Sequence, residues 1–147
     1  MRDWPLSTTA ALGALALGIA ACSSSPTNTN NCGSGAPPDL SGTYLMSSYT
    51  LGSQTWASPT SSGTLQVTAS TYSYSMNLST GTGSPQFVSD AGTYQLVGAT
   101  CIRQTSSTDT TKNFSGSFVL QTASGATTFR ESGSDGIHEV IWLWLKS

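Results

Sequence analysis

Three cysteines, Cys22, Cys32 and Cys101, are the residues of this chain with the clearest capacity for chemistry. A thiol can be acylated, oxidised or bound to a metal, and its surroundings decide among these reactions. Cys22 follows an apolar run over residues 10–21, which itself follows a short N-terminal stretch containing Arg2. A charged start, a short apolar middle and small residues at its end predict a secretory signal over residues 1–21. A run of about a dozen apolar residues is too short to span a bilayer.

The residues Ile19-Ala20-Ala21-Cys22 resemble the lipobox of bacterial lipoproteins, which is an aliphatic residue, two small residues and a cysteine. The resemblance implies a diacylglyceryl group on the Cys22 thiol, cleavage before Cys22 and acylation of the new amino group. Two or more acyl chains hold a protein stably at a membrane. Ser23, rather than Asp, follows the cysteine, which implies the outer membrane if the host has two membranes. The alternative is an ordinary secretory signal that is cleaved near Ala21.

Cys32 and Cys101 remain as a pair if Cys22 carries lipid. Outside the cytoplasm we expect them to form a disulfide, the alternative being two free thiols. We expect no metal site, because His138 is the only histidine and no close ligand spacing is present. Residues 22–38 lack large apolar side chains and are rich in Ser, Asn, Pro and Gly, which predicts a flexible tether. The folded domain is expected over residues 39–147.

The composition argues against nucleic-acid binding and catalysis. Only 8% of the residues are charged and the net charge is −2, so no basic patch is expected. The carboxylates are scattered, mostly in expected turns, and His138 adjoins Glu139, whose side chain would lie on the opposite face of a strand. No nucleophile elbow or phosphate-binding loop is present. We therefore expect a protein that is not an enzyme and that has no cofactor.

Alternation of apolar and polar residues predicts an all-β domain. The clearest case has Tyr72, Tyr74, Met76 and Leu78 on one face of a strand and hydroxyl or amide side chains on the other. Short gaps rich in Gly and Ser favour antiparallel hairpins. About eight strands are expected, near residues 42–50, 63–70, 71–79, 86–90, 92–98, 100–106, 114–122 together with 126–131, and 138–146. We predict an antiparallel up-and-down barrel, with a two-sheet β-sandwich as the alternative.

The last expected strand is apolar on both faces over residues 140–145. An unpaired edge of this kind promotes aggregation, so we expect it to be paired on both sides and to close the barrel. The alternative is an exposed face that docks a partner or the membrane.

Three segments resemble the bacterial lipocalin-like families of the calycin group. They are residues 40–44, which read Leu-Ser-Gly-Thr-Tyr, residues 63–67 followed by 71–74, and residues 92–96, which read Gly-Thr-Tyr-Gln-Leu. Tyr44 stands where those families usually have Trp. The resemblance implies a closed eight-stranded barrel and, in some members, an apolar cavity.

We expect the barrel to bind a small apolar or amphipathic molecule. The residues expected to line its cavity are Tyr72, Tyr74, Met76, Phe118, Trp142 and Trp144. Trp56, in the long connection over residues 50–62, is either a lid residue that touches this ligand or a surface aromatic on its own loop. Arg103 and Arg130 either bind an acidic head group inside the barrel or lie on its outer face.

The sequence is compatible with two other functions. One is a structural lipoprotein with a filled barrel whose outer surface binds another envelope protein. The other is inhibition of a secreted hydrolase, because residues 123–126 followed by Phe129 resemble an element of lysozyme-inhibitor lipoproteins.

Overall fold

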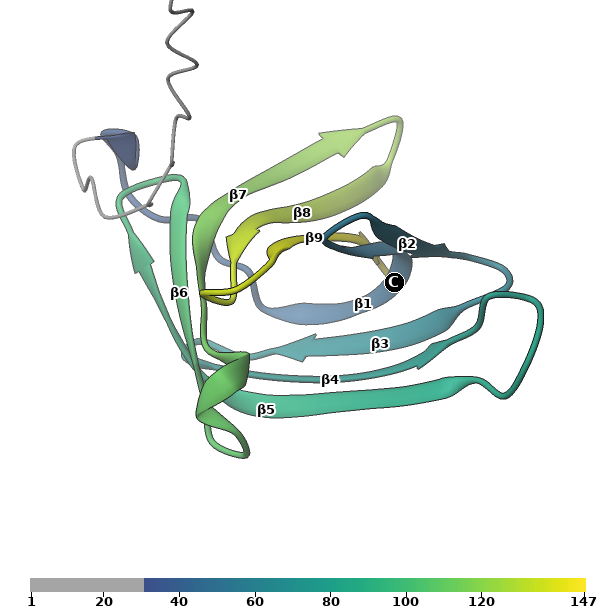
Figure 1. The fold of residues 1–147 in the computed structure, drawn as a ribbon. Helices are drawn as coiled ribbons and strands as arrows, with labels where there is room; N and C mark the ends of the chain where they lie inside the picture. Colours follow the sequence, from purple (N-terminus) through teal and green to yellow (C-terminus); the bar gives the residue numbers. More distant parts are fainter. Residues whose placement is uncertain (1–30) are drawn as a thin grey trace, which may run out of the picture.

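The computed structural model describes residues 31–147, and almost all of its regular structure is antiparallel β-strand (Figure 1). The expected signal sequence, the lipidation of Cys22 and most of the expected tether lie outside the described residues. The strands are β1 (Gly42–Leu51), β2 (Gln54–Ala57), β3 (Ser62–Val67), β4 (Thr71–Leu78), β5 (Gln86–Val97), β6 (Cys101–Ser106), β7 (Phe114–Ala123), β8 (Ala126–Ser134) and β9 (Glu139–Lys146). One short 3-10 helix, η2 (Thr110–Lys112), follows β6. Within residues 31–147, no helix is long and apolar enough to cross a membrane.

The strands form one closed barrel. From β3 to β9 each strand pairs with the next, and β9 pairs with β1 to complete the circle. The antiparallel up-and-down barrel expected from the sequence is therefore confirmed, and the β-sandwich alternative is wrong.

Strands β2 and β3 lie one after the other along β1. The first half of β1, from Gly42 to Leu45, pairs with β3, and its second half, from Ser48 to Leu51, pairs with β2. Between them, the Ser58 amide donates to the carbonyl of Ser47 at 3.0 Å. The two short strands thus fill a single position in the barrel, which gives eight strand positions for nine strands.

The expected strand boundaries need two corrections. The strands expected at 86–90 and 92–98 are one continuous strand, β5, which pairs with β4 along its first part and with β6 along its second. Residues 114–122 and 126–131 were grouped as one element but form two strands, β7 and β8, which make a hairpin. The two partners lie on opposite edges of β5, which stands between β4 and β6 in the barrel.

Strand β9 is paired on both edges, as expected from its sequence. Its partners are β8 and β1. Val140, Trp142 and Trp144 point into the barrel and are buried, whereas Leu145 on the other face is 42% exposed. The closure of the barrel by this strand is therefore confirmed.

Two glycines on neighbouring strands allow an aromatic ring to lie flat on the inner wall. Gly116 of β7 and Gly133 of β8 are opposite one another. A Cβ atom at Gly116 would lie 2.7 Å from the Phe114 ring and one at Gly133 would lie 2.9 Å from it. Such a Cβ would also collide with the backbone of the facing strand, so any side chain at either position would disturb the β7–β8 pairing as well as the fully buried Phe114.

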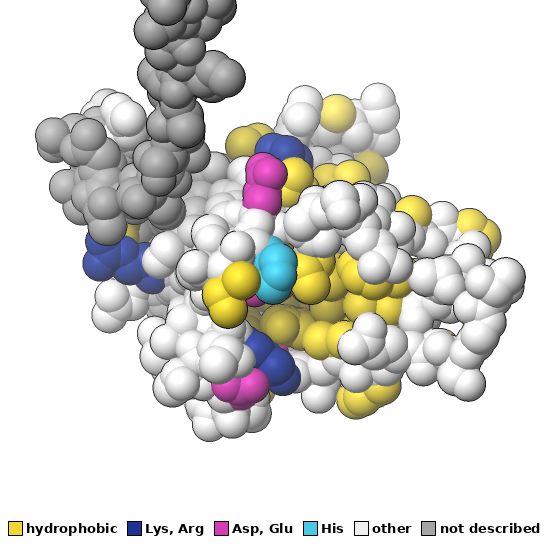
Figure 2. Space-filling model, viewed as in Figure 1, with side chains coloured by type: hydrophobic (Ala, Val, Ile, Leu, Met, Phe, Trp, Pro, Cys, Tyr) yellow, Lys and Arg dark blue, Asp and Glu magenta, His cyan; other side chains and the backbone are white. Residues whose placement is uncertain are grey.

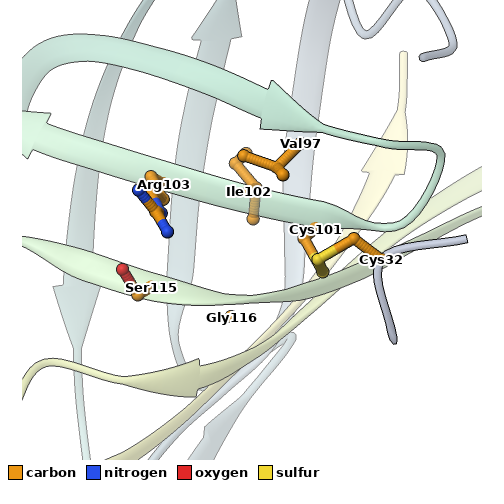
Figure 3. Close-up of a pocket in the computed structure, with 7 residues that line it drawn as sticks. All are labelled: Cys32, Val97, Cys101, Ile102, Arg103, Ser115 and Gly116. Carbon is orange, nitrogen blue, oxygen red and sulfur yellow. A yellow bond between two sulfur atoms is a disulfide. The ribbon is translucent and has the colours of Figure 1, made fainter. Parts of the chain in front are cut away.

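The disulfide between Cys32 and Cys101 is present, as expected (Figure 3). It joins the segment before β1 to the first residue of β6, and its Cα atoms are 5.0 Å apart. The Thr100 amide also donates to the Cys32 carbonyl at 3.0 Å. Residues 32 and 33 therefore contact the barrel, ahead of the boundary expected at residue 39.

Removal of this disulfide should destabilise the barrel strongly. The bridge joins residues 69 positions apart, and closing such a loop restricts the unfolded chain by about 4 kcal/mol in the chain-entropy treatment. We expect a Cys32→Ser/Cys101→Ser variant to lose a free energy of unfolding of this order, measured by urea denaturation. A Cys22→Ala variant is the matched control and should unfold like the parent protein. Equal midpoints for all three proteins would contradict the prediction.

Candidate functional site

The two ends of the barrel differ, and we name them by their residues. The mouth is the end where β1 finishes and β9 begins, around Leu51 and Val140, which are opposite one another. The base is the opposite end, which carries Leu40 and the turn between β5 and β6. Cys32 is bonded to Cys101 at the base.

Aromatic rings stack in a ladder between the mouth and the middle of the barrel. We call Trp56, Tyr49 and Trp142 the aromatic ladder. Tyr49 stacks on Trp56 with ring centroids 5.5 Å apart, and on Trp142 with centroids 5.8 Å apart. Phe114 meets Trp142 edge-on at 4.9 Å. Stacked and edge-to-face rings attract one another beyond the area they bury, so the ladder is a stable unit.

Trp56 is not a surface aromatic on a loop. It lies on β2 and is only 9% exposed, because pairing of β2 with β1 places it opposite Tyr49. Whether it touches a ligand remains a prediction.

Apolar side chains are visible from outside at the mouth. Figure 2 shows them in a hollow at the centre of this face, with the single histidine, His138, at its edge. Three side chains that pack on the core and are only partly buried, Leu51, Tyr74 and Val88, belong to the strands that surround the mouth. The His138 ring is held beside Gly52, and its Nδ1 lies 3.5 Å from Asp135 Oδ2. The mouth is thus an apolar opening with a polar rim.

Inside the barrel, Asp90 is buried and fully occupied by hydroxyl donors. It accepts hydrogen bonds from Tyr72 at 2.7 Å, Ser106 at 2.5 Å and Thr108 at 2.6 Å. Burial, and then the hydrogen bond to Asp90, raise the pKa of Tyr72 well above its usual range. Tyr72 therefore remains a proton donor to Asp90 and is fixed in place by it.

Glu131 is the second buried carboxyl group, and its situation is different. It is 2% exposed and receives one hydrogen bond, from Gln104 Nε2 to Oε1 at 2.6 Å. The Trp144 indole nitrogen lies near the carboxyl group without completing a hydrogen bond to it. Burial raises the pKa of Glu131 to about 8, because the charged form loses its hydration. Glu131 is therefore protonated at neutral pH and can donate a hydrogen bond.

Two more buried donors accompany Glu131. The indole nitrogens of Trp142 and Trp144 find no acceptor among the described residues. Trp142 is directly opposite Glu131 across the β8–β9 pair. Buried polar groups without partners are uncommon in native proteins and deserve a functional explanation.

The seven residues expected to bind a ligand all face the interior, but they form two groups. Trp56, Tyr74 and Trp142 belong to the ladder or contact it, and Tyr72 stacks on Tyr74 at 6.2 Å. Met76, Phe118 and Trp144 are 1–2% exposed and lie within the packed core. Phe118 contacts Phe129, which in turn contacts Tyr44, nearer the base. The structure places no ligand against these residues, so their role in binding stays a prediction.

Several residues of the interior were not expected from the sequence, among them Leu40, Tyr49, Asp90, Gln104 and Glu131. Glu131 was counted among scattered carboxylates, yet it faces inward on β8 between Phe129 and Gly133. The alternation of Phe129, Glu131 and Gly133 was the signal that marked it as an interior residue. Tyr49 was less accessible to sequence reasoning, because a bulge between Met46 and Ser48 changes the inward register of β1.

Arg103 and Arg130 are exposed, so the first of their two expected positions, inside the barrel, is wrong. Within residues 31–147, no three His, Cys, Asp or Glu side chains are placed to share a metal ion. Comparison with protein-family models, with curated proteins and with solved structures finds no match.

The buried carboxyl group predicts a pH dependence of stability. The unfolded chain releases the Glu131 proton near pH 4.3, whereas the folded chain holds it to about pH 8. Between these values the free energy of unfolding falls as pH rises, by up to about 1.4 kcal/mol per pH unit from this group. We expect Glu131→Gln to remove this slope and to stabilise the protein at pH 8, in urea titrations from pH 5 to 8.

The matched control is Glu139→Gln, because Glu139 is exposed near the start of β9. That variant should keep the slope of the parent protein. An unchanged slope in Glu131→Gln would mean that Glu131 is not buried as a neutral acid.

Proposed function

We propose that the protein is a lipid-anchored lipoprotein of the cell envelope whose barrel mouth binds the apolar part of a small amphipathic molecule. One observation carries the binding proposal, which is the aromatic ladder of Trp56, Tyr49 and Trp142 beneath an apolar opening. Small-molecule sites are usually concave, mostly apolar and lined by aromatic rings, with a few polar groups for orientation. The polar rim at Asp135 and His138 supplies such groups.

The proposed lipid anchor and the mouth lie toward opposite ends of the barrel. The lipobox resemblance places the lipid at Cys22, and the short stretch that follows leads to Cys32, which is fixed at the base by its disulfide. The mouth lies at the other end of the barrel. An anchor at the base leaves the mouth free to accept a molecule from the surrounding solution or from a partner.

Docking of another envelope protein is a second candidate function. Leu45 and Leu145 are opposite one another on the outside of the barrel and are 50% and 42% exposed. Neighbouring exposed apolar side chains mark interaction surfaces on many proteins. Site-directed crosslinking in cells from position 45 would identify such a partner. Inhibition of a secreted hydrolase stays a prediction, to be tested with a lysozyme assay.

Lipidation should depend on one thiol. We expect the Cys22→Ala variant of the full chain, expressed in bacteria, to lose incorporated radiolabelled fatty acid and to leave the membrane fraction, because the acyl acceptor is gone. Cys32→Ser/Cys101→Ser should remain labelled and membrane-bound. Release of the disulfide variant together with retention of Cys22→Ala would contradict the proposed anchor.

Binding at the mouth should depend on the ladder. We expect N-phenyl-1-naphthylamine, an apolar fluorescent probe, to bind the parent protein and to bind Trp56→Ala about tenfold more weakly, as loss of one stacked ring implies. Phe87→Ala is the matched control, because Phe87 is 70% exposed on the outer face of β5. Thermal unfolding of each variant verifies the fold. Absence of probe binding, together with no co-purified mass in native mass spectrometry, would contradict ligand binding at the mouth.

A further inference from the structure

Leu40 is a plug between the interior of the barrel and the surface of its base. Its side chain is 1% exposed, and the Tyr44 hydroxyl holds its carbonyl at 2.7 Å. On the inner side of Leu40 lies a void of about 10 Å³, whose lining includes Tyr72, Gln104 and Glu131. This is about the space that one water molecule needs.

On its outer side, Leu40 lines a depression in the base of about 390 Å³. The same depression is lined by Pro37, Pro38, Ala69, Tyr94 and Leu96, and Asp39 is the one charged residue among the described residues that line it. Leu40 and Tyr94 belong to the lining of both spaces. The void beside Glu131 is thus separated from this surface hollow by two side chains, Leu40 and Tyr94.

The hydroxyl groups around the void are already engaged, and Glu131 is not. Of the lining residues, Tyr72 donates to Asp90 at 2.7 Å and Tyr94 donates to the Thr68 carbonyl at 2.8 Å. The Glu131 carboxyl group accepts from Gln104 Nε2 through Oε1, and the other polar group beside it is the Trp144 indole N–H, which is also a donor. Neither neighbour offers an acceptor to the hydroxyl of a protonated Glu131. A protonated Glu131 therefore has one free donor beside the void.

The charges near this donor disfavour an ionised ligand. The groups that face Glu131 are neutral tyrosines, the Gln104 amide and the Trp144 indole, and Asp90 lies beyond Tyr72. Arg103 and Arg130 are on the outside. The Lys146 ammonium lies over the Tyr44 ring, 5.6 Å from its centroid, and donates to the Ser41 carbonyl at 2.8 Å. An anion at Glu131 would thus be buried without a cation, which is costly. A neutral hydrogen-bond acceptor meets no such penalty.

We infer that the base of the barrel holds a second binding site, for an uncharged amphiphile of the ester or amide class. Its carbonyl oxygen accepts a hydrogen bond from Glu131 in the void, and its alkyl chain takes the place of the Leu40 side chain and extends into the depression. This site lies at the opposite end from the mouth and rests on separate observations.

Replacement of the Leu40 side chain by the ligand's alkyl chain requires this side chain to move and leaves the backbone in place. The hydrogen bond from Tyr44 to the Leu40 carbonyl and the Cys32–Cys101 bridge hold the segment on the base. The free energy gained by burial of the alkyl chain offsets the cost of exposing the Leu40 side chain, because both groups are aliphatic and the hydrophobic free energy follows the apolar area that is buried.

The test compares binding of methyl decanoate and of decanoate, which have the same acyl chain and differ in charge. Tryptophan fluorescence of the complete, folded protein at pH 7 should report binding of the ester and at least tenfold weaker binding of the anion. Leu40→Ala opens the void to the depression and should increase ester affinity several-fold. Glu131→Leu should abolish ester binding, whereas Glu131→Gln keeps a donor and should retain it.

A pH profile separates a ligand contact from a structural role of Glu131. Ester affinity should fall as pH rises through about 8, where Glu131 loses its proton, and Glu131→Gln should show no such fall. This readout does not depend on Glu131→Leu, which exchanges a polar interior residue and can fail to fold.

The outcomes also separate the base from the mouth. Ester binding that is weakened by Trp56→Ala but unchanged by Leu40→Ala and Glu131→Gln at every pH would overturn the base site and support the mouth. Equal binding of ester and anion, or no ester binding to either the parent protein or Leu40→Ala, would overturn the inference. Ester binding that follows Leu40 and Glu131 and is indifferent to Trp56 would establish it.

Discussion

The pairing of β9 with both β8 and β1 is the constraint on which the remaining structure depends. Closure removes the sheet edges, and it also fixes the radius of the barrel. An eight-stranded barrel has an interior just wide enough to be filled by its own side chains. Every inward position must then supply a side chain of suitable size, so the interior is where the sequence is most tightly determined.

Large aromatic side chains satisfy this constraint only because small ones stand opposite them. Phe114 occupies space that Gly116 and Gly133 leave free, and it contacts Trp142 of the ladder. Trp142 in turn supports Tyr49, and Tyr49 supports Trp56. A chain of contacts thus runs from the glycine pair on β7 and β8 to the short strand β2 at the mouth. The position of the outermost ring depends on residues deep in the wall.

The sequence predicts those parts of the interior that alternation of apolar and polar residues reveals, and it does not predict the others. Alternation in β4 and the double-sided apolar character of β9 identify inward residues, because a strand has a period of two. Alternation cannot reveal that β5 runs unbroken from Gln86 to Val97, or that β2 and β3 are two separate strands along β1. It also fails after the bulge in β1, which is why Tyr49 was missed. Leu40 stands at the start of the predicted domain, before the first strand, where no alternation marks an inward position, so only tertiary structure shows it to be buried.

The need to fill the barrel interior with side chains does not explain the buried polar groups. Asp90 has three hydroxyl donors and costs little once they are in place. Glu131 has one donor, and two indole nitrogens in the same interior have no acceptor. An apolar side chain at residue 131 would avoid the desolvation penalty that raises the pKa of Glu131 to about 8. Selection for stability alone would not favour this desolvation penalty. Recognition of a polar group inside an apolar wall requires a buried hydrogen-bond donor such as protonated Glu131. The incomplete pairing of Glu131 is therefore better explained by recognition than by packing.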